Sequence, residues 1–172
     1  MIRLLILIFI ILNGCGYTTR GFVYSEKNIA IAPVVNNISI TSEDRKYSTF
    51  TSYPVLLENR VTNALRNKFN IDGHLKVVGD EVDALRLTCA INEYKREVTR
   101  YTNTDDVKEQ RLRLAVHMKL TNPKGEVTKE KDVVGETSYF LTGANSMSES
   151  AAQDKLIDDT TRRILEAVIE EW

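Results

Sequence analysis

Two segments in which apolar and polar side chains alternate strictly constrain the fold of this chain more than any other feature. Apolar side chains fill every second position from 85 to 91 and again from 112 to 120. This period of two is typical of β-strands with one buried face. The turn residues Asn122–Gly125 lead from the second segment into a strand region at 126–141, so we predict an antiparallel meander. After Asn92 the alternation changes phase, which predicts either a β-bulge or a strand that projects past the sheet.

Four further segments complete the predicted elements. An apolar strand spans 29–35, with Pro33 at a strand end or a sheet edge, and a short strand spans 75–78. Amphipathic helices are predicted over 54–69, with proline as the first residue, and from the capping-box sequence that opens with Ser146 to the end of the chain. This order predicts an α+β fold with two helices packed on one face of a mixed four- to five-stranded sheet. The other face of the sheet is expected to stay open.

The first fifteen residues have the layout of a lipoprotein signal. Arg3 precedes an unbroken apolar run at 4–12, and the sequence Leu-Asn-Gly-Cys ends at Cys15. The run is too short to span a bilayer as a helix. We therefore predict a cleaved signal peptide at residues 1–14 and lipidation of Cys15, with an ordinary secretory signal as the alternative. Gly16 stands where lipoproteins retained in the inner membrane usually carry aspartate, which favours the outer membrane.

The rest of the chain is predicted to hold one domain. Residues 15–28 form the lipid anchor and a short tether, and residues 29–172 form a single α+β domain without an internal repeat. Between Asn36 and Tyr53 the composition turns to Asn, Ser, Thr and charged residues. This loop is longer than most connections, so a functional role is expected for it.

Charge and composition exclude several classes of function. With 23 Lys and Arg against 24 Asp and Glu, the net charge is −1, so we predict no nucleic-acid partner. The cysteines and histidines lack the spacing of a structural zinc site, and Gly-rich phosphate loops are absent from the sequence. His74 and His117 stand in unlike settings without a nucleophile motif. We therefore predict neither an enzyme nor a cofactor.

Cys89 is the one cysteine besides Cys15. It alternates with apolar residues on the side of the strand predicted to face the core, where a free cysteine behaves as a small apolar residue. Pairing with a partner chain is the alternative, because an odd cysteine in an oxidising compartment can form such a bond.

The polar side of the meander carries a row of basic residues. His117 belongs to this row, and the candidate contacts for an anionic ligand are Arg86, Arg111, Arg113, Lys119, Lys129 and Lys131. Such a patch suits a phosphate-rich partner. The alternative interpretation is a solvated strand face that acidic neighbours partly neutralise. These neighbours are Glu93, Glu109, Glu130 and Asp132.

Four segments, in order along the chain, follow the pattern of one known family. The sequence Cys-Gly-Tyr-Thr-Thr-Arg-Gly at 15–21 is similar to that family's opening, and 29–37 to its first strand with the asparagine that follows. Residues 61–69 are similar to the family's L-T-x-A-L-x-x-x-F helix, with Val61 in place of leucine. Residues 83–87 are similar to its A-D-x-x-L strand entry, although the order of the residues differs. Together with the length and the lipoprotein signal, these segments resemble LptE, the family of lipopolysaccharide-assembly lipoproteins.

The resemblance implies an outer-membrane lipoprotein that is not an enzyme and carries no cofactor. It implies that the protein plugs an LptD-like β-barrel, assists the assembly of that barrel and binds lipopolysaccharide during its transport to the cell surface. The implied partners are therefore the barrel, lipopolysaccharide and the membrane that holds the lipid anchor. The implied location is the periplasmic face of the outer membrane and the barrel lumen.

A second interpretation belongs to another class of protein. Strands of the form I-A-x-x-P-x-x-N also occur in lipoproteins that reach across the periplasm and activate a cell-wall synthase. Such activators have a long disordered linker after the lipid, whereas barely a dozen residues separate Cys15 from the first predicted strand here. The protein that copurifies with the chain discriminates between the two interpretations.

Overall fold

The computed structural model describes residues 27–38, 53–79, 83–104 and 106–169. Its elements are β1 (Asn28–Ile31), β2 (Val35–Asn36), α3 (Leu57–Asp72), β3 (Lys76–Val78), β4 (Leu85–Tyr101), β5 (Val107–Thr121), β6 (Val127–Phe140) and α4 (Glu149–Ile169). The predicted signal peptide, Cys15, nearly all of the tether and most of the long loop lie outside the described residues.

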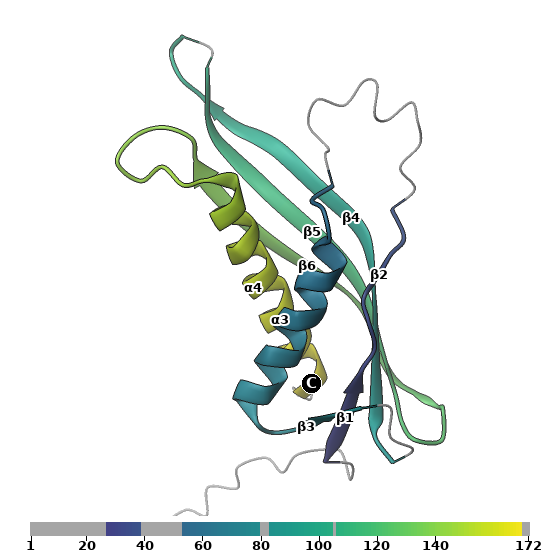
Figure 1. Ribbon diagram of the computed structural model, residues 1–172. Coiled ribbons are helices and arrows are strands. Elements are labelled where there is room, and N and C mark those ends of the chain that lie inside the picture. The colour runs from purple at the N-terminus through teal and green to yellow at the C-terminus, as the bar shows by residue number, and fades with distance from the viewer. Residues whose placement is uncertain (1–26, 39–52, 80–82, 105, 170–172) are drawn as a thin grey trace, which may run out of the picture.

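The described strands form one sheet with the order β3-β1-β4-β5-β6, and β2 also pairs with β4. β1 is parallel to β3 and β4, whereas β4, β5 and β6 form the predicted antiparallel meander. Both helices lie on the same face of this sheet (Figure 1). The predicted α+β fold, with two helices on one face of a mixed sheet, is confirmed.

The sheet has six strands rather than four or five because the segment predicted as one strand at 29–35 forms two. Pro33 lacks an amide hydrogen and cannot donate to a strand ladder. β1 therefore ends at Ile31 and β2 begins at Val35, and each of them pairs in parallel with β4. The expected strand end at Pro33 is confirmed.

The core lies between the sheet and the helices. The inner face of β5 supplies five side chains with no exposed surface, namely Leu112, Leu114, Val116, Met118 and Leu120. α3 supplies four more at a spacing of four residues, namely Leu57, Val61, Leu65 and Phe69. Burying one such side chain stabilises a fold by roughly 1.5–3 kcal/mol. Neither described helix has the length and apolar character needed to cross a membrane.

The predicted bulge lies in β4. The register of β4 against β5 shifts between Ile91 and Glu93. Before the shift the odd-numbered residues face the helices, and after it the even-numbered Tyr94 does so, with 7% of its surface exposed. Because one extra residue reverses the alternation, Glu93 faces the open side of the sheet.

Both helices begin later than the sequence predicts. α3 begins at Leu57 rather than at the predicted proline, because Leu56 has a left-handed φ of 58° that is incompatible with helix. At the start of α4, Ser148 replaces Ser146 as the cap, since its Oγ accepts a hydrogen bond from the amide of Ala151 at 3.2 Å.

α4 crosses β6 in very close contact at Gly135. A Cβ atom at this position would lie 2.1 Å from Oγ1 of Thr160 and 2.9 Å from its Cα. The hydroxyl of Thr160 is itself fixed, since it donates to the carbonyl of Leu156 at 2.7 Å. Only glycine therefore allows the helix backbone to approach the strand this closely.

We expect Gly135→Ala to destabilise the fold by about 1–3 kcal/mol, because the added methyl group must push α4 away from β6. Chemical unfolding monitored by circular dichroism measures this change. Gly79→Ala is the matched control, since its Cβ would meet no atom within 4 Å. Equal stability of the two variants would contradict the proposed close contact.

Candidate functional site

The open face of the meander is the candidate site, because it carries the predicted basic row. Arg111, Arg113, His117 and Lys119 all point away from the helices and are partly exposed, between fully or nearly fully buried neighbours of β5. The predicted alternation of β5 is therefore confirmed. What the sequence could not show is which residues of β4 and β6 lie beside this row.

Arg113 lies between two carboxylates, one on each neighbouring strand. Its Nε is 3.7 Å from Oε2 of Glu93 on β4 and 3.7 Å from Oε1 of Glu136 on β6. These separations exceed a hydrogen bond, so the contacts are ion pairs. Arg111 is 3.8 Å from the same Glu136. The glutamate from β6 is thus shared by two arginines of β5.

His117 is held between two acids of β6. Its Nδ1 lies 2.7 Å from Oδ1 of Asp132, and its Nε2 lies 2.9 Å from Oε1 of Glu130. Hydrogen bonds to Asp132 and then to Glu130 raise the pKa of His117 above its ordinary value of 6.5. The protonated imidazole can donate to both carboxylates at once, which explains the direction of the shift.

Ion pairs also occur on the open face near the turn that joins β4 to β5. Nζ of Lys95 lies 2.8 Å from Oε1 of Glu97, and Nε of Arg100 lies 3.5 Å from Oε2 of Glu109. The hydrogen bond between Lys95 and Glu97 lowers the pKa of the carboxyl and raises that of the amine. The face is therefore a ladder of alternating charges, as in the alternative interpretation of the sequence, and not a uniformly cationic surface.

Lys119 differs from the rest of the row. It lies across from Thr88 on β4 and Glu130 on β6. Glu130 is engaged by His117, and no ion pair of Lys119 occurs among the described residues. Lys119 is therefore the member of the predicted row that is best placed to meet an external anion.

Lys129 and Lys131 do not extend the basic row, which corrects the sequence-based expectation. They lie across from Leu120 and Met118, whose side chains face the helices. Nζ of Lys129 donates to the carbonyl of Ala167 in the last turn of α4 at 2.6 Å. The physical reason is that the register with β5 decides which residues of β6 face the helices. The spacing of two lysines in the sequence does not reveal this register.

Arg86 joins the open face at its lower end, across from Thr121. It also lines a cavity of about 200 Å³ at the end of β1, together with Pro33 and Arg66. Arg66 donates to the carbonyl of Ile31 at 3.1 Å. The cavity thus places two arginines near one another, one of which already stabilises the end of β1.

A polar cluster under the start of α4 was missed by the sequence analysis. Arg96 of β4 faces the helices, and its Nη1 lies 2.7 Å from Oε2 of Glu149. Nearby, the hydroxyl of Tyr139 donates to Oε1 of Gln110 at 2.6 Å in a buried contact. The phase change after Asn92 was the available signal, because it turns the even positions of β4 inward.

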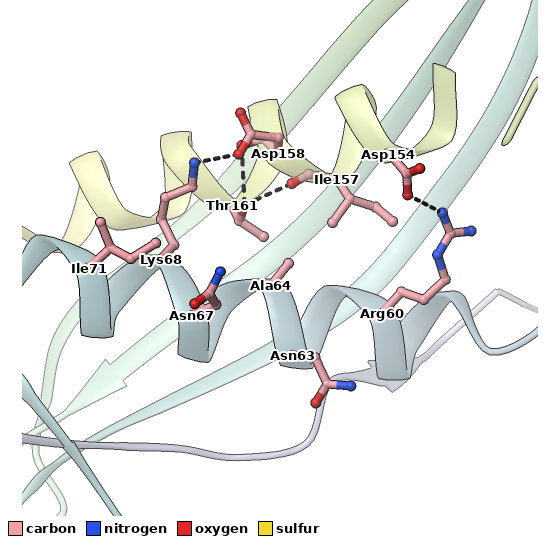
Figure 2. Close-up of a pocket in the computed structure, with 10 residues that line it drawn as sticks. All are labelled: Arg60, Asn63, Ala64, Asn67, Lys68, Ile71, Asp154, Ile157, Asp158 and Thr161. Carbon is pink, nitrogen blue, oxygen red and sulfur yellow. Dashed lines mark hydrogen bonds and ion pairs between the residues drawn. The ribbon is translucent and has the colours of Figure 1, made fainter. Parts of the chain in front are cut away.

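The two helices are joined by ion pairs along a surface groove of about 470 Å³. Figure 2 shows Arg60 reaching from α3 to Asp154 of α4 at 2.7 Å, and Lys68 reaching to Asp158. The remainder of the groove is lined by exposed and half-buried side chains of α3 and by the buried Ile157 and Thr161 of α4. These contacts fix the helices to one another.

Neither of the remaining candidate groups forms a reactive centre. Cys89 is 4% exposed, and burial raises the pKa of its thiol to about 12, so the residue belongs to the core as predicted. His74 is bound through Nδ1 to Asp72 at 2.7 Å on the surface. Among the described residues, no cluster of three acidic, histidine or cysteine side chains could hold a metal ion.

The sequence from residue 35 to residue 171 matches the LptE family, which is described as lipopolysaccharide-assembly. The chain belongs to the LptE family. The match extends from β2 to the end of α4 and therefore includes the whole meander and both helices. As a member of this family, the protein is a membrane-associated lipoprotein of lipopolysaccharide assembly. The family is non-enzymatic, so the protein is not an enzyme.

Solved structures of three bacterial proteins share this fold. The hypothetical protein CT253 from Chlamydia trachomatis is 10% identical with a TM-score of 0.53, over 84% of this chain and 98% of that chain. A minor lipoprotein from Acinetobacter baumannii is 18% identical with a TM-score of 0.50, over 86% and 93%. Lipoprotein B from Nitrosomonas europaea is 13% identical with a TM-score of 0.51, over 87% and 90%. These likenesses concern the fold alone, and no curated protein sequence matches the chain.

The His117 cluster predicts a pH dependence of stability. A histidine whose pKa is raised in the folded state stabilises the fold fully below its unfolded pKa, near 6.5, and this contribution is lost as the pH rises through the folded pKa. We expect Asp132→Asn to lower the pKa of His117 in an NMR titration and to flatten the pH dependence of unfolding in this window. Glu166→Gln on α4 is the control, and an unchanged pKa in the Asp132 variant would refute the assignment.

Proposed function

We propose that this member of the LptE family is anchored in the outer membrane through Cys15 and occupies the lumen of an LptD-like β-barrel. There it assists the assembly of the barrel and contacts lipopolysaccharide during transport. The observation that carries this proposal is the family match over residues 35–171. The lipoprotein signal that ends at Cys15 supports the anchor, and Gly16 after it supports the outer-membrane location.

The surface of the domain is compatible with a barrel interior. The lumen of a transmembrane barrel is polar, and the open sheet face presents ion pairs such as Arg113 with Glu93 and Glu136. On the other side, the helices present Arg60 and Asp154 to solvent. Apart from Lys119, the charges named here on both broad faces are paired, so these faces can contact a polar wall.

The identity of the partner tests the main proposal. We expect the full chain, tagged after its last residue and purified from outer membranes in detergent, to retain a large β-barrel in stoichiometric amount. Mass spectrometry identifies the retained protein. Cys15→Ala should remove the lipid anchor and reduce the amount of the chain in the membrane fraction. Retention of a cell-wall synthase, or of no partner, would contradict the barrel assignment.

For lipopolysaccharide, the proposed contacts are the outward basic residues of the open face, Arg86, Arg111, Arg113 and Lys119. Lys119 is the strongest of these, because its charge is not engaged in an ion pair within the described part of the chain. The phosphates of lipid A and of the core sugars are suitable partners for such a cation. Lys129 and Lys131 stand on the helix side of β6, so any contact they make belongs to a different surface.

We expect Lys119→Glu to weaken the binding of purified lipopolysaccharide by about tenfold, because a charge-assisted contact becomes a repulsive one. Binding to the purified full chain is measured by fluorescence anisotropy with labelled lipopolysaccharide. Lys155→Glu, at an exposed position of α4, has the same change in net charge and serves as the control. If both variants bind as the wild type does, the open face does not contact lipopolysaccharide.

A further inference from the structure

β6 is the last described strand of the sheet, and among the described residues part of its outer edge has no hydrogen-bond partner. Two groups on this edge are satisfied, since the amide of Glu136 donates to Oδ2 of Asp159 at 3.1 Å and the carbonyl of Phe140 accepts from Met147 at 2.9 Å. In an antiparallel ladder every second residue directs its amide and carbonyl to the same side. The backbone amides and carbonyls of Asp132 and Val134 are therefore directed to the outer edge of the sheet, as the amide of Glu136 is.

Within the described part of the chain, the outward backbone groups of Asp132 and Val134 have no hydrogen-bond partner. An exposed row of this kind is a template for an added strand. The row is bounded, because Asp159 covers the edge at Glu136 and Lys129 binds α4 at the other end. The open part of the edge is long enough for a short extended segment only.

A groove runs beside this part of the edge. It has a volume of about 390 Å³ and lies between residues 131–134 of β6 and Arg163, Glu166 and Ala167 of α4. An extended peptide bound there would form a ladder with β6 and direct alternate side chains toward α4. A free strand edge beside a helix is the arrangement by which proteins bind a peptide through β-augmentation.

We propose that the edge of β6 at residues 131–134 binds an extended segment of a partner protein as an additional antiparallel strand, and that this segment carries basic residues at alternate positions. This surface is separate from the row of Lys119 and from the lipid anchor. The proposal therefore goes beyond the function proposed above.

The charge of the edge selects the partner. On the open face of the sheet, β6 carries three carboxylates, Glu130, Asp132 and Glu136. His117 alone pairs with both Glu130 and Asp132, so these two acids keep a net negative charge, and Asp132 has 74% of its side chain exposed. Opposite charges directly across two strands stabilise the pair by roughly 0.2–1 kcal/mol, and like charges destabilise it. Lysine or arginine on a bound segment would lie across from this row.

The same row disfavours a second copy of this chain as the occupant. Two copies joined edge to edge by antiparallel pairing can be centred on residue 132, 133 or 134 of β6. In each of these registers, at least two carboxylates of the row lie across from one another. Self-association through this edge would therefore bring like charges together, whereas a basic partner strand would neutralise them.

The test uses the full chain in mild detergent and a fluorescein-labelled nine-residue peptide that alternates arginine and valine. We expect saturable binding in fluorescence anisotropy and slower hydrogen exchange at the amides of Asp132 and Val134. A peptide with glutamate in place of arginine should bind at least about tenfold more weakly. Binding without protection of these two amides, or equal binding of both peptides, would overturn the proposal.

Two further comparisons isolate the strand ladder. Val134→Pro removes one amide of the outer edge and is tolerated on an edge strand. We expect this variant to bind the peptide about five- to tenfold more weakly. Val134→Ala keeps the amide and should bind nearly as the wild type does. A peptide whose N-methyl groups replace the amide hydrogens that face β6 should no longer bind the unmodified protein. A peptide methylated at the amides that face away from β6 should still bind. Equal binding of the two peptides, or a dimer through this edge in sedimentation experiments, would refute the inference.

Discussion

The burial of a single face of the β4-β5-β6 meander is the constraint on which the rest of this structure depends. Five inner side chains of β5, from Leu112 to Leu120, have no exposed surface, and two helices are needed to exclude water from so long a row. The helices must also approach closely, which the contact between Gly135 and Thr160 allows. Because both helices serve this one face, the opposite face of the meander has to be stable in contact with water or with a partner.

The open face meets this requirement by pairing its charges across strands. Arg113 is placed between carboxylates from β4 and β6, and His117 between two acids of β6. Exposed pairs of this kind contribute little each, yet together they neutralise a row of cations that would otherwise repel one another. For a family that acts in lipopolysaccharide assembly, this balance leaves Lys119 as the member of the β5 row without an ion pair among the described residues.

The two ends of the sheet differ in a way that matters for interactions. On one side the sheet ends with the short strands β1 and β3, and Pro33 ends the ladder of β1. On the other side β6 is long, and Asp159 satisfies one amide of its outer edge, whereas the neighbouring edge groups have no partner among the described residues. The described part of the fold therefore offers a balanced charged face, a helical face with its own ion pairs, and an uncovered stretch of the β6 edge beside α4.

The sequence by itself determined the elements of this fold and the family. Alternation along 112–120 defined the buried face of β5, the phase change after Asn92 predicted the bulge, and the order of the motifs indicated LptE. The alternation and the phase change are local features, so a single segment contains each of them. The partners of the basic row were decided by the register, which places Glu136 beside Arg113 and turns Lys129 toward α4. A register is a relation between strands distant in sequence, and only the packed sheet fixes it.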